Sequence, residues 1–421
     1  MTGGEVAAAP AFFGRLRHLG LASYWFGLNF HWIPILTVLI PLQVSRLVQP
    51  DRQGSRLALI TGLGAIFAVL LPPLVGAGSD RLSTRWGRRR PIMAVGTLGN
   101  LVGLLLLLRA DSYGWLIVGY LVVQIFNNSA GAAFNGIIPD VVPEPEYGRA
   151  SGLLGAFVQV GSVAGLAGTI LMAGLGHAEW TYGLIAVVLL ISLLPTLWAS
   201  GGEGLKPVVA PPVTGGPAAL ARFLAPLFAG DFAWVILTRT FITAGFYAVV
   251  PFLLLFFRDV VRVRDPVTFT SIWDLLVLLA ATPFGLAGGL ISDRLGRKVF
   301  VYASGGLMSL VVVLFVIFFP TATSVVLGLG VLFGVGYGLY YAVDWALACD
   351  TLPDRRQPAK DMGLFHVSYT LPQVFMPAVA GSLLDVFNRQ GHNAGYRAMF
   401  SASAACFLLG TVFVRRIRSV R

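Results

Sequence analysis

The chain is poor in charged residues. Only 12% of its 421 residues are Asp, Glu, Lys or Arg, and 56% are hydrophobic. A soluble globular protein carries about 25% charged and roughly 45–50% apolar residues. This chain lacks the polar groups that would cover a water-exposed surface, so its composition indicates a membrane protein. Apolar runs recur along the whole length, which leaves no polar stretch long enough for an attached nucleotide-binding or catalytic domain.

Residue patterns of several site classes are also missing. Only two cysteines occur, Cys349 and Cys406, without Cys-x-x-Cys or Cys/His spacing, which argues against a disulfide scaffold and a structural zinc site. The five histidines show no metal spacing, and no Gly-x-x-x-x-Gly-Lys-Ser/Thr loop is present to hold a nucleotide. We therefore expect no cofactor, no metal and no enzyme activity.

Long apolar segments are what the chain does contain. A helix needs about 20 mostly apolar residues to cross the hydrocarbon layer of a membrane. Twelve such segments lie between turn and charge signals, at residues 20–43, 56–78, 91–108, 114–138, 149–175, 180–200, 229–257, 268–291, 298–319, 322–348, 361–385 and 395–414. The sequence therefore predicts an all-α membrane protein with twelve transmembrane helices.

The formal net charge of +11 reflects orientation in the membrane. When the loops are taken alternately, 20 Arg and Lys residues fall on one side, 9 on the other, and Arg239 lies inside a span. Loops rich in Arg and Lys stay in the cytoplasm. We therefore expect both termini in the cytoplasm, a location in the inner or plasma membrane, and no nucleic-acid partner.

The chain has two similar halves. Residues 201–226, rich in Gly and Pro, separate a six-span unit at 1–200 from another at 227–421. The second and eighth spans end in GAGSDR and GLISDR, whose aspartates are 213 residues apart, and Asp140 and Asp350 end the fourth and tenth spans 210 apart. A steady offset indicates a duplicated unit. Two six-helix halves around a midplane cavity are typical of transporters that work by alternating access.

Two loops carry a family resemblance. GLISDRLGRK, residues 289–298, is similar to the loop signature Gly-x-x-x-Asp-Arg-x-Gly-Arg-Lys of the major facilitator superfamily. The first-half version, GAGSDRLSTRWGRRRP at 76–91, is stretched by four residues between Asp and Gly. That form resembles the glycoside-pentoside-hexuronide cation symporters and the related sucrose-proton symporters. The resemblance implies the major facilitator fold, in two pseudo-symmetric bundles, and symport of a sugar or glycoside.

The resemblance also bears on the coupling ion. Sodium-coupled members of the glycoside symporters use membrane-embedded carboxylates in the first half. Here every first-half acid lies in a loop or at a span end. We therefore expect coupling to protons through the second half, or no coupling at all.

Charged residues at the inner span ends are candidates for a gate. A carboxylate there can accept hydrogen bonds from the free amides at the N-terminus of a neighbouring helix. Asp80 and Asp293 are placed for this, and nearby arginines can bridge to other acids and hold the cytoplasmic ends together. Alternatively, the arginines only set orientation and the aspartates are helix caps. The predicted gating residues are Asp80, Arg81, Arg88, Asp140, Arg149, Asp293, Arg294, Arg297 and Asp350.

Polar residues inside the first-half spans are candidates for substrate binding, because polar groups facing lipid are unfavourable. The candidates in the first span lie roughly 15–20 Å from its start at about 1.5 Å per residue, near the midplane. Those in the fourth span share one helical stripe. The alternative for these amides is interhelical hydrogen bonding that only holds the bundle. The residues are Asn29, His31 and Trp32 in the first span and Gln124, Asn127 and Asn128 in the fourth.

The second half contributes an expected ion pair. Arg239 in the seventh span and Asp344 in the tenth lie at similar depth, because the two spans run in opposite directions. The superfamily pattern implies that they share the cavity with aromatic candidates Tyr337 and Tyr341. We hypothesise that protonation of Asp344 releases Arg239 and couples a proton to the conformational switch, with His31 as a further proton-coupling candidate. A purely structural ion pair is the alternative.

Together these features predict a secondary active transporter of a small organic solute. A sugar or glycoside is favoured by the stretched loop. Efflux of a drug or natural product is the alternative, and a non-transporting membrane sensor is less favoured because no sizeable soluble output domain is present. The expected partners are a small-molecule substrate, protons and the lipid bilayer; the sequence carries no sign of oligomeric state. Asp274, near the outer end of the eighth span, is expected to be solvated and idle.

Overall fold

The computed structural model describes residues 14–80, 82, 84–143, 146–201, 225–228, 230–353, 358–391 and 393–419. Over these residues the chain is helical and forms no strand. Twelve helical segments are long and apolar enough to cross a membrane. This confirms the predicted class of an all-α protein with twelve membrane-spanning helices.

The first half supplies six of these spans. The first is composite, because α1, the π-helix η1 and α2 follow one another without a loop. The bounds are α1 Arg15–Ile33, η1 Pro34–Leu39, α2 Ile40–Leu47, α3 Gln53–Asp80, α4 Arg90–Leu108, α5 Tyr113–Val141, α6 Tyr147–Gly174 and α7 Thr181–Ala199.

The second half supplies the other six. The seventh span is again composite, with the short helices η6, α10 and η7 after α9. The bounds are α9 Gly230–Val249, η6 Val250–Phe252, α10 Leu253–Phe256, η7 Phe257–Val261, α11 Pro266–Leu295, α12 Arg297–Phe318, α13 Thr323–Asp350, α14 Pro358–Asn388 and α15 Ala394–Phe413. Most of the predicted linker, 201–226, lies outside the described residues.

The broken first and seventh spans were not predicted from hydropathy. Pro34 begins the π-helix of the first span, and Pro251 lies in the 3₁₀ turn of the seventh. Proline has no backbone N–H, so it removes a helical hydrogen bond and its ring clashes with the preceding turn. The helix changes pitch at these positions instead of running straight through. Both breaks lie at corresponding places in the two halves.

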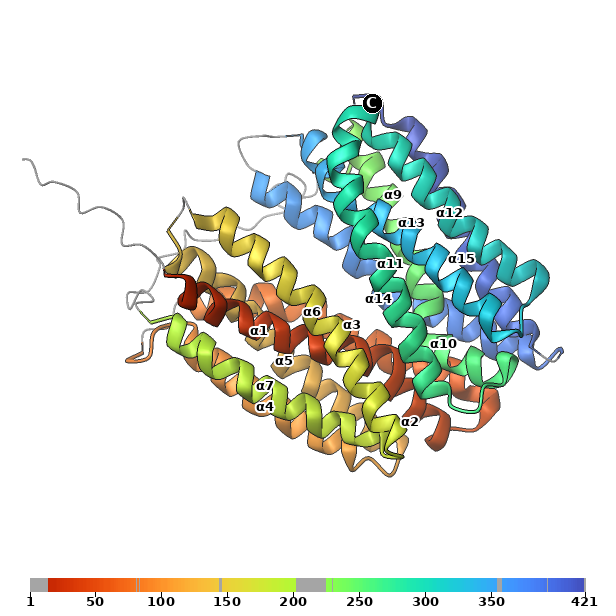
Figure 1. Ribbon diagram of the computed structural model, residues 1–421, viewed down its shortest axis with the longest axis horizontal. Helices are drawn as coiled ribbons and strands as arrows, with labels where there is room; N and C mark the ends of the chain where they lie inside the picture. The colour runs from red at the N-terminus through yellow and green to blue at the C-terminus, as the bar shows by residue number, and fades with distance from the viewer. Residues whose placement is uncertain are drawn as a thin grey trace, which may run out of the picture.

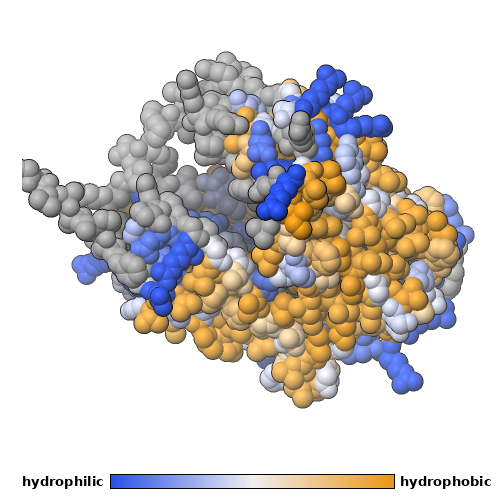
Figure 2. Space-filling view, turned by 45° about the horizontal axis from the view of Figure 1, so that its top comes forward, coloured by the Kyte–Doolittle hydropathy of each residue, from blue (hydrophilic) through white to orange (hydrophobic). Residues whose placement is uncertain are grey.

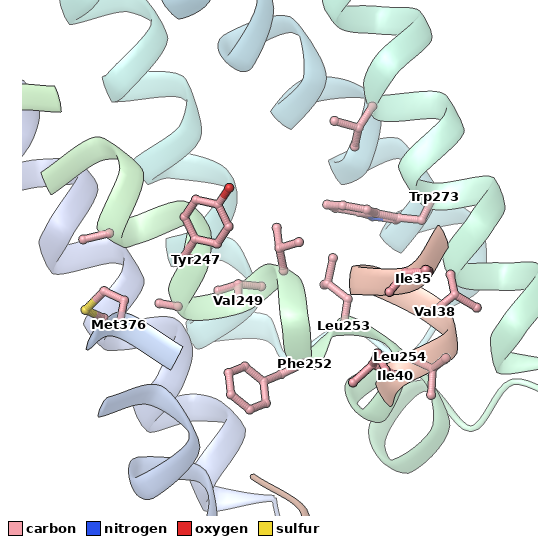
Figure 3. Close-up of a cluster of buried hydrophobic side chains, with 14 of the residues drawn as sticks. Ile35, Val38, Ile40, Tyr247, Val249, Phe252, Leu253, Leu254, Trp273 and Met376 are labelled. Atoms are coloured by element: carbon pink, nitrogen blue, oxygen red, sulfur yellow. The ribbon is translucent and has the colours of Figure 1, made fainter. Parts of the chain in front are cut away.

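The two breaks meet in space. Ile35 and Val38 of η1 lie beside Leu253 of α10 and Trp273 of α11 in one buried hydrophobic cluster (Figure 3). Each of these side chains is at most 5% exposed. Burial of apolar surface of this kind stabilises contact between the halves at this level.

Close helix packing depends on glycine in both halves. A Cβ at Gly165 of α6 would collide with the backbone oxygen of Phe30 in α1, and one at Gly334 of α13 would lie 2.5 Å from the backbone oxygen of Val277 in α11. Helices that approach this closely gain van der Waals contact that larger residues would prevent.

The spans gather into two bundles that diverge from a common base. Helices α1–α7 form one bundle and α9–α15 the other (Figure 1). We call the end that carries Arg15, Gly201 and Ala225 the linker end, and the end that carries Arg109 and Arg389 the far end. The bundles meet toward the far end, and the molecule is hollowed between them toward the linker end (Figure 2). Hydrophobic side chains cover most of the surface visible in that view.

Candidate functional site

The far end is closed by contacts between the bundles. The carboxylate of Asp385 in α14 accepts hydrogen bonds from the backbone nitrogens of Gly54 (2.9 Å) and Ser55 (2.7 Å) at the start of α3. A helix N-terminus favours an anion, so this contact is both a hydrogen-bonded and an electrostatic link. Beside it, Arg258 of η7 donates to Gln53 over 2.7 Å. We call these contacts the far seal.

The far seal also needs two glycines. A Cβ at Gly54 would lie 2.6 Å from the backbone oxygen of Gly381 in α14, and a Cβ at Gly381 would collide with the backbone oxygen of Gly54. The backbones of α3 and α14 therefore touch directly, which only residues without a side chain permit.

The linker ends of α3 and α6 are different. Hypothetical Cβ atoms at Gly76 and Gly78 of α3, and at Gly152 and Gly155 of α6, have no neighbour within 4 Å. Along α3, Gly54 at the far end is packed against the other bundle, whereas Gly76 and Gly78 at the linker end meet no neighbour. This asymmetry is the one expected of a transporter caught with its cavity open to one side.

An ion pair lies inside the second bundle. Arg239 of α9 and Asp344 of α13 approach to 3.3 Å between Nε and Oδ2, as the sequence predicted. They are 7% and 6% exposed. The hydroxyl of Tyr340 donates to the other carboxylate oxygen over 2.8 Å. The carboxylate of Asp344 is therefore held from both sides.

Arg239 has further neighbours and one free donor. Its guanidinium lies 3.8 Å from the ring centre of Phe365, which is a cation–π contact. Its Nη1 is buried and has no hydrogen-bond partner among the described residues. An unpaired buried donor is costly, so this nitrogen is available to an acceptor that enters from the cavity.

The ion pair opens onto a cleft lined mainly by aromatic rings. The cleft holds about 340 Å³ of free space, counting its mouth. Phe246 stacks on Tyr337 with ring centres 5.2 Å apart, and Tyr337 meets Tyr341 at 4.6 Å. Tyr341 is 42% exposed, so the cleft is open at this side. The predicted residues Arg239, Tyr337, Tyr341 and Asp344 thus share one site. The lining residues are Arg239, Ile242, Thr243, Phe246, Met308, Tyr337, Tyr340, Tyr341, Asp344, Tyr369 and Phe407.

The first-half amides form a different group, inside their own bundle. Asn100 of α4, which sequence reasoning missed, donates to Asn127 over 3.0 Å and lies 3.5 Å from Nε2 of His31. His31 is fully buried, and its Nδ1 has no hydrogen-bond partner among the described residues. The described neighbours of His31 in this bundle are therefore amides.

The remaining first-half candidates bond within single helices. Gln124 donates to the hydroxyl of Tyr120 over 2.7 Å, and Asn128 donates to the side-chain oxygen of Gln124 over 2.8 Å. Asn29 donates to the backbone oxygen of Trp25 one turn earlier. Trp32 packs edge-on against His31. Among the described contacts, no hydrogen bond links these residues to the cleft in the second bundle.

Charged residues at the linker end pair within each bundle. Arg88 and Arg89 both bind the carboxylate of Asp140, and Arg297 binds Asp350 at 2.8 Å. Arg149 and Arg294 are exposed. The side chains of Asp80 and Asp293, and all of Arg81, lie outside the described residues. The ion pairs described at the linker end thus each lie within one bundle.

The family is decided by comparison over the full chain. A family model described as the Major Facilitator Superfamily matches residues 19–359 and 265–421. The chain belongs to the major facilitator superfamily. It is accordingly a multi-pass membrane protein of a transporter superfamily.

Several named transport and resistance proteins match the chain over part of their length. The chain is 26% identical to "Sucrose transport protein SUC4" of Arabidopsis thaliana over 35% of this chain and 32% of that protein. It is 37% identical to human "Proton-associated sugar transporter A" over 21% of this chain and 11% of that protein. It is 31% identical to "Tetracycline resistance protein, class E" of Escherichia coli over 32% of this chain and 30% of that protein. The matched stretches thus span about a third or less of these relatives.

A solved superfamily structure matches over almost the full length. The nucleoside transporter NupG superposes with a TM-score of 0.73 over 96% of this chain and 100% of that chain, at 14% sequence identity. This likeness establishes the major facilitator fold.

Proposed function

We propose that this protein is a proton-coupled transporter of a sugar or glycoside that works by alternating access. The observation that carries the proposal is the Arg239–Asp344 pair in the wall of the aromatic cleft, since it places a titratable group next to a candidate binding site. The names of the sucrose and proton-associated sugar relatives and the stretched loop at 76–91 support the substrate class. The halves 1–200 and 227–421 are the moving units.

Orientation follows from the distribution of charge. The linker end carries most of the Arg and Lys residues, which favours the cytoplasm. Both termini are then cytoplasmic in an inner or plasma membrane, and the conformation described above is inward-facing. The far end faces the outside.

The cleft offers contacts that suit a carbohydrate. Sugar C–H faces pack against aromatic rings such as Phe246 and Tyr337, and hydroxyl groups can bond to tyrosine hydroxyls and to the free Nη1 of Arg239. Efflux of a drug is the second candidate, favoured by the tetracycline-resistance relative and the many aromatic rings. Acid-stimulated uptake of a labelled glycoside supports import, whereas lowered drug accumulation in expressing cells supports efflux.

Proton coupling follows from the chemistry of the pair. When Asp344 is ionised, it holds Arg239 and accepts from Tyr340. When Asp344 takes up a proton, its attraction to Arg239 falls and the guanidinium is free to bind substrate or to shift with α9. A switch of this kind acts by changing the relative stability of two conformations.

The charged residues at the linker end would serve as the gate on the inner side. In the inward-facing conformation Asp140 is held by Arg88 and Arg89, and Asp350 by Arg297. We propose that these clusters, together with Asp80, Arg81, Arg149, Asp293 and Arg294, bind across the hollow when the linker end closes. Gly152 and Gly155 provide a face without side chains for that closure.

The Asp344→Asn variant tests the coupling. In proteoliposomes with an inwardly directed proton gradient, we expect uptake of a labelled glycoside to fall to the level of empty vesicles, because the amide cannot titrate. Exchange of substrate without a gradient should persist. Asp111→Asn, which changes an exposed loop carboxylate, is the control and should leave both activities unchanged. Gradient-driven uptake by Asp344→Asn at the unaltered rate would refute the coupling role.

A further inference from the structure

Asp274 of α11 is a buried carboxyl group that the mechanism above does not use. It lies about two turns after Pro266, where α11 packs against η1 of the other bundle. The residue is 8% exposed, and its Oδ2 has no hydrogen-bond partner among the described residues. The expectation that Asp274 is solvated is therefore wrong, because η1 covers it from the opposite half. Its neighbour Trp273 lies beside Ile35 and Val38 of the same segment (Figure 3).

The side chain of Thr37 in η1 lies next to this carboxyl across the interface. The Thr37 hydroxyl donates its hydrogen to the backbone oxygen of Ile33 over 2.9 Å. The Thr37 hydroxyl is a neutral group, so it does not balance the charge of an ionised Asp274.

No described cation compensates the carboxyl. η1 and α10 contain no ionisable side chain. On η7, Arg258 binds the adjacent Asp259 at 2.6 Å. The other charged and titratable groups on elements packed against α11 lie toward the linker end or deeper in the bundle: Arg149 on α6; Arg297, Lys298 and Tyr302 on α12; and Tyr337, Tyr340, Tyr341, Asp344, Cys349 and Asp350 on α13.

Depth separates Asp274 from the coupling pair. Asp274 follows the far end of α11 by about two turns, whereas Asp344 is near the opposite end of α13. At about 1.5 Å per residue the two carboxyls are roughly 20 Å apart along the membrane normal. They therefore meet the medium on different sides of the closed interface.

We propose that Asp274 is a second proton-binding site, reached from the far side, and that the far end closes only while this carboxyl is protonated. An ionised carboxylate without a partner is unfavourable in a dry interface, so it opposes docking of η1 onto α11. When the far end opens, η1 withdraws and water reaches the carboxyl, which then ionises. Proton uptake from the outside thus favours the inward-facing conformation. This role rests on the proposed function, since it makes the alternation between outward-facing and inward-facing conformations depend on the outer pH.

The test measures conformation and needs neither substrate nor flux. Nitroxide labels are attached at the exposed far-end positions 109 and 389, one on each bundle, in a chain whose Cys349 and Cys406 are replaced by Ser. Their distance distribution is recorded in liposomes from about pH 5 to about pH 8. In the otherwise unchanged protein we expect the short-distance population to grow as the pH falls. In Asp274→Asn, which keeps the shape and cannot ionise, we expect that population to dominate at every pH.

Controls separate this site from the others. Asp111→Asn, an exposed carboxyl at the same end, and Asp344→Asn should both keep the pH response. Asp274→Ser, smaller and also neutral, should behave as Asp274→Asn and serves if that variant does not fold. A pH response that survives in the neutral Asp274 variants, or that is absent from the unchanged protein, overturns the proposal. Such a result leaves the Asp344 uptake test unaffected, so the two failures are distinguishable.

Discussion

Gly381→Leu will hold the far end open. A side chain at this position collides with the backbone oxygen of Gly54, and its Cβ would lie 2.8 Å from the Cβ of Ala58. Both obstacles lie on α3, so relief requires α14 and α3 to separate. The bulk is tolerated once the bundles part at the far end, and the fold within each bundle is unaffected. We therefore expect the outward-open population to become dominant and net transport to cease.

The measurement is the distance between labels at positions 109 and 389, which should lengthen in Gly381→Leu. Gly183→Leu is the matched control, because a Cβ at Gly183 meets nothing within 4 Å. Asp385→Asn should lengthen the distance in a smaller fraction of molecules, since it removes the anion bound at the N-terminus of α3 and leaves the glycine contact intact. A short distance retained in Gly381→Leu would show that the contact between α3 and α14 does not close the far end.

Arg239→Met will destabilise the protein strongly. The substitution puts an apolar side chain of similar length in place of Arg239 and leaves Asp344 buried without its cation. Removing one partner of a buried ion pair costs about 3–5 kcal/mol. The unpaired carboxyl is relieved when it takes up a proton, so the loss should be greatest at high pH and shrink as the pH falls. We expect a Tm lower by several degrees in detergent at neutral pH.

The double variant Arg239→Met/Asp344→Leu separates the unpaired charge from altered packing. Replacing both members of a buried pair with apolar residues is often neutral or stabilising. We therefore expect the double variant to recover most of the lost Tm while gradient-driven uptake remains absent. Equal Tm values for the single and double variants would show that the charge of Asp344 is not what destabilises Arg239→Met.

The sequence predicted those features that depend on position along a single helix. Span number follows from hydropathy, and the meeting of Arg239 with Asp344 follows from counting residues inward from two span ends. These features are local, or need only one-dimensional arithmetic.

Contacts between the halves were not predictable in this way. Gly54 and Asp385 are 331 residues apart, and no periodic pattern links them. Counting residues places Asp274 near the outer end of its span, but it does not show that η1 of the other half covers the side chain. The residue was therefore expected to be solvated, whereas it is buried. Asn100 carried a usable signal, since an amide in an otherwise apolar span usually finds a polar partner, but its bond to Asn127 depends on how α4 and α5 are rotated. The first-half amides likewise faced their own bundle, which helical periodicity cannot distinguish from the cavity.

The most direct test of the account is the side from which the cleft can be reached. A single cysteine at Tyr341→Cys, in a chain without Cys349 and Cys406, lies in the open wall of the cleft. An impermeant maleimide is applied to either face of oriented vesicles. We predict reaction from the linker side in the otherwise unchanged protein and from the far side once Gly381→Leu is added. Reaction from both sides at once in either protein, or from the linker side alone in both, would contradict a hollow that opens to one face at a time.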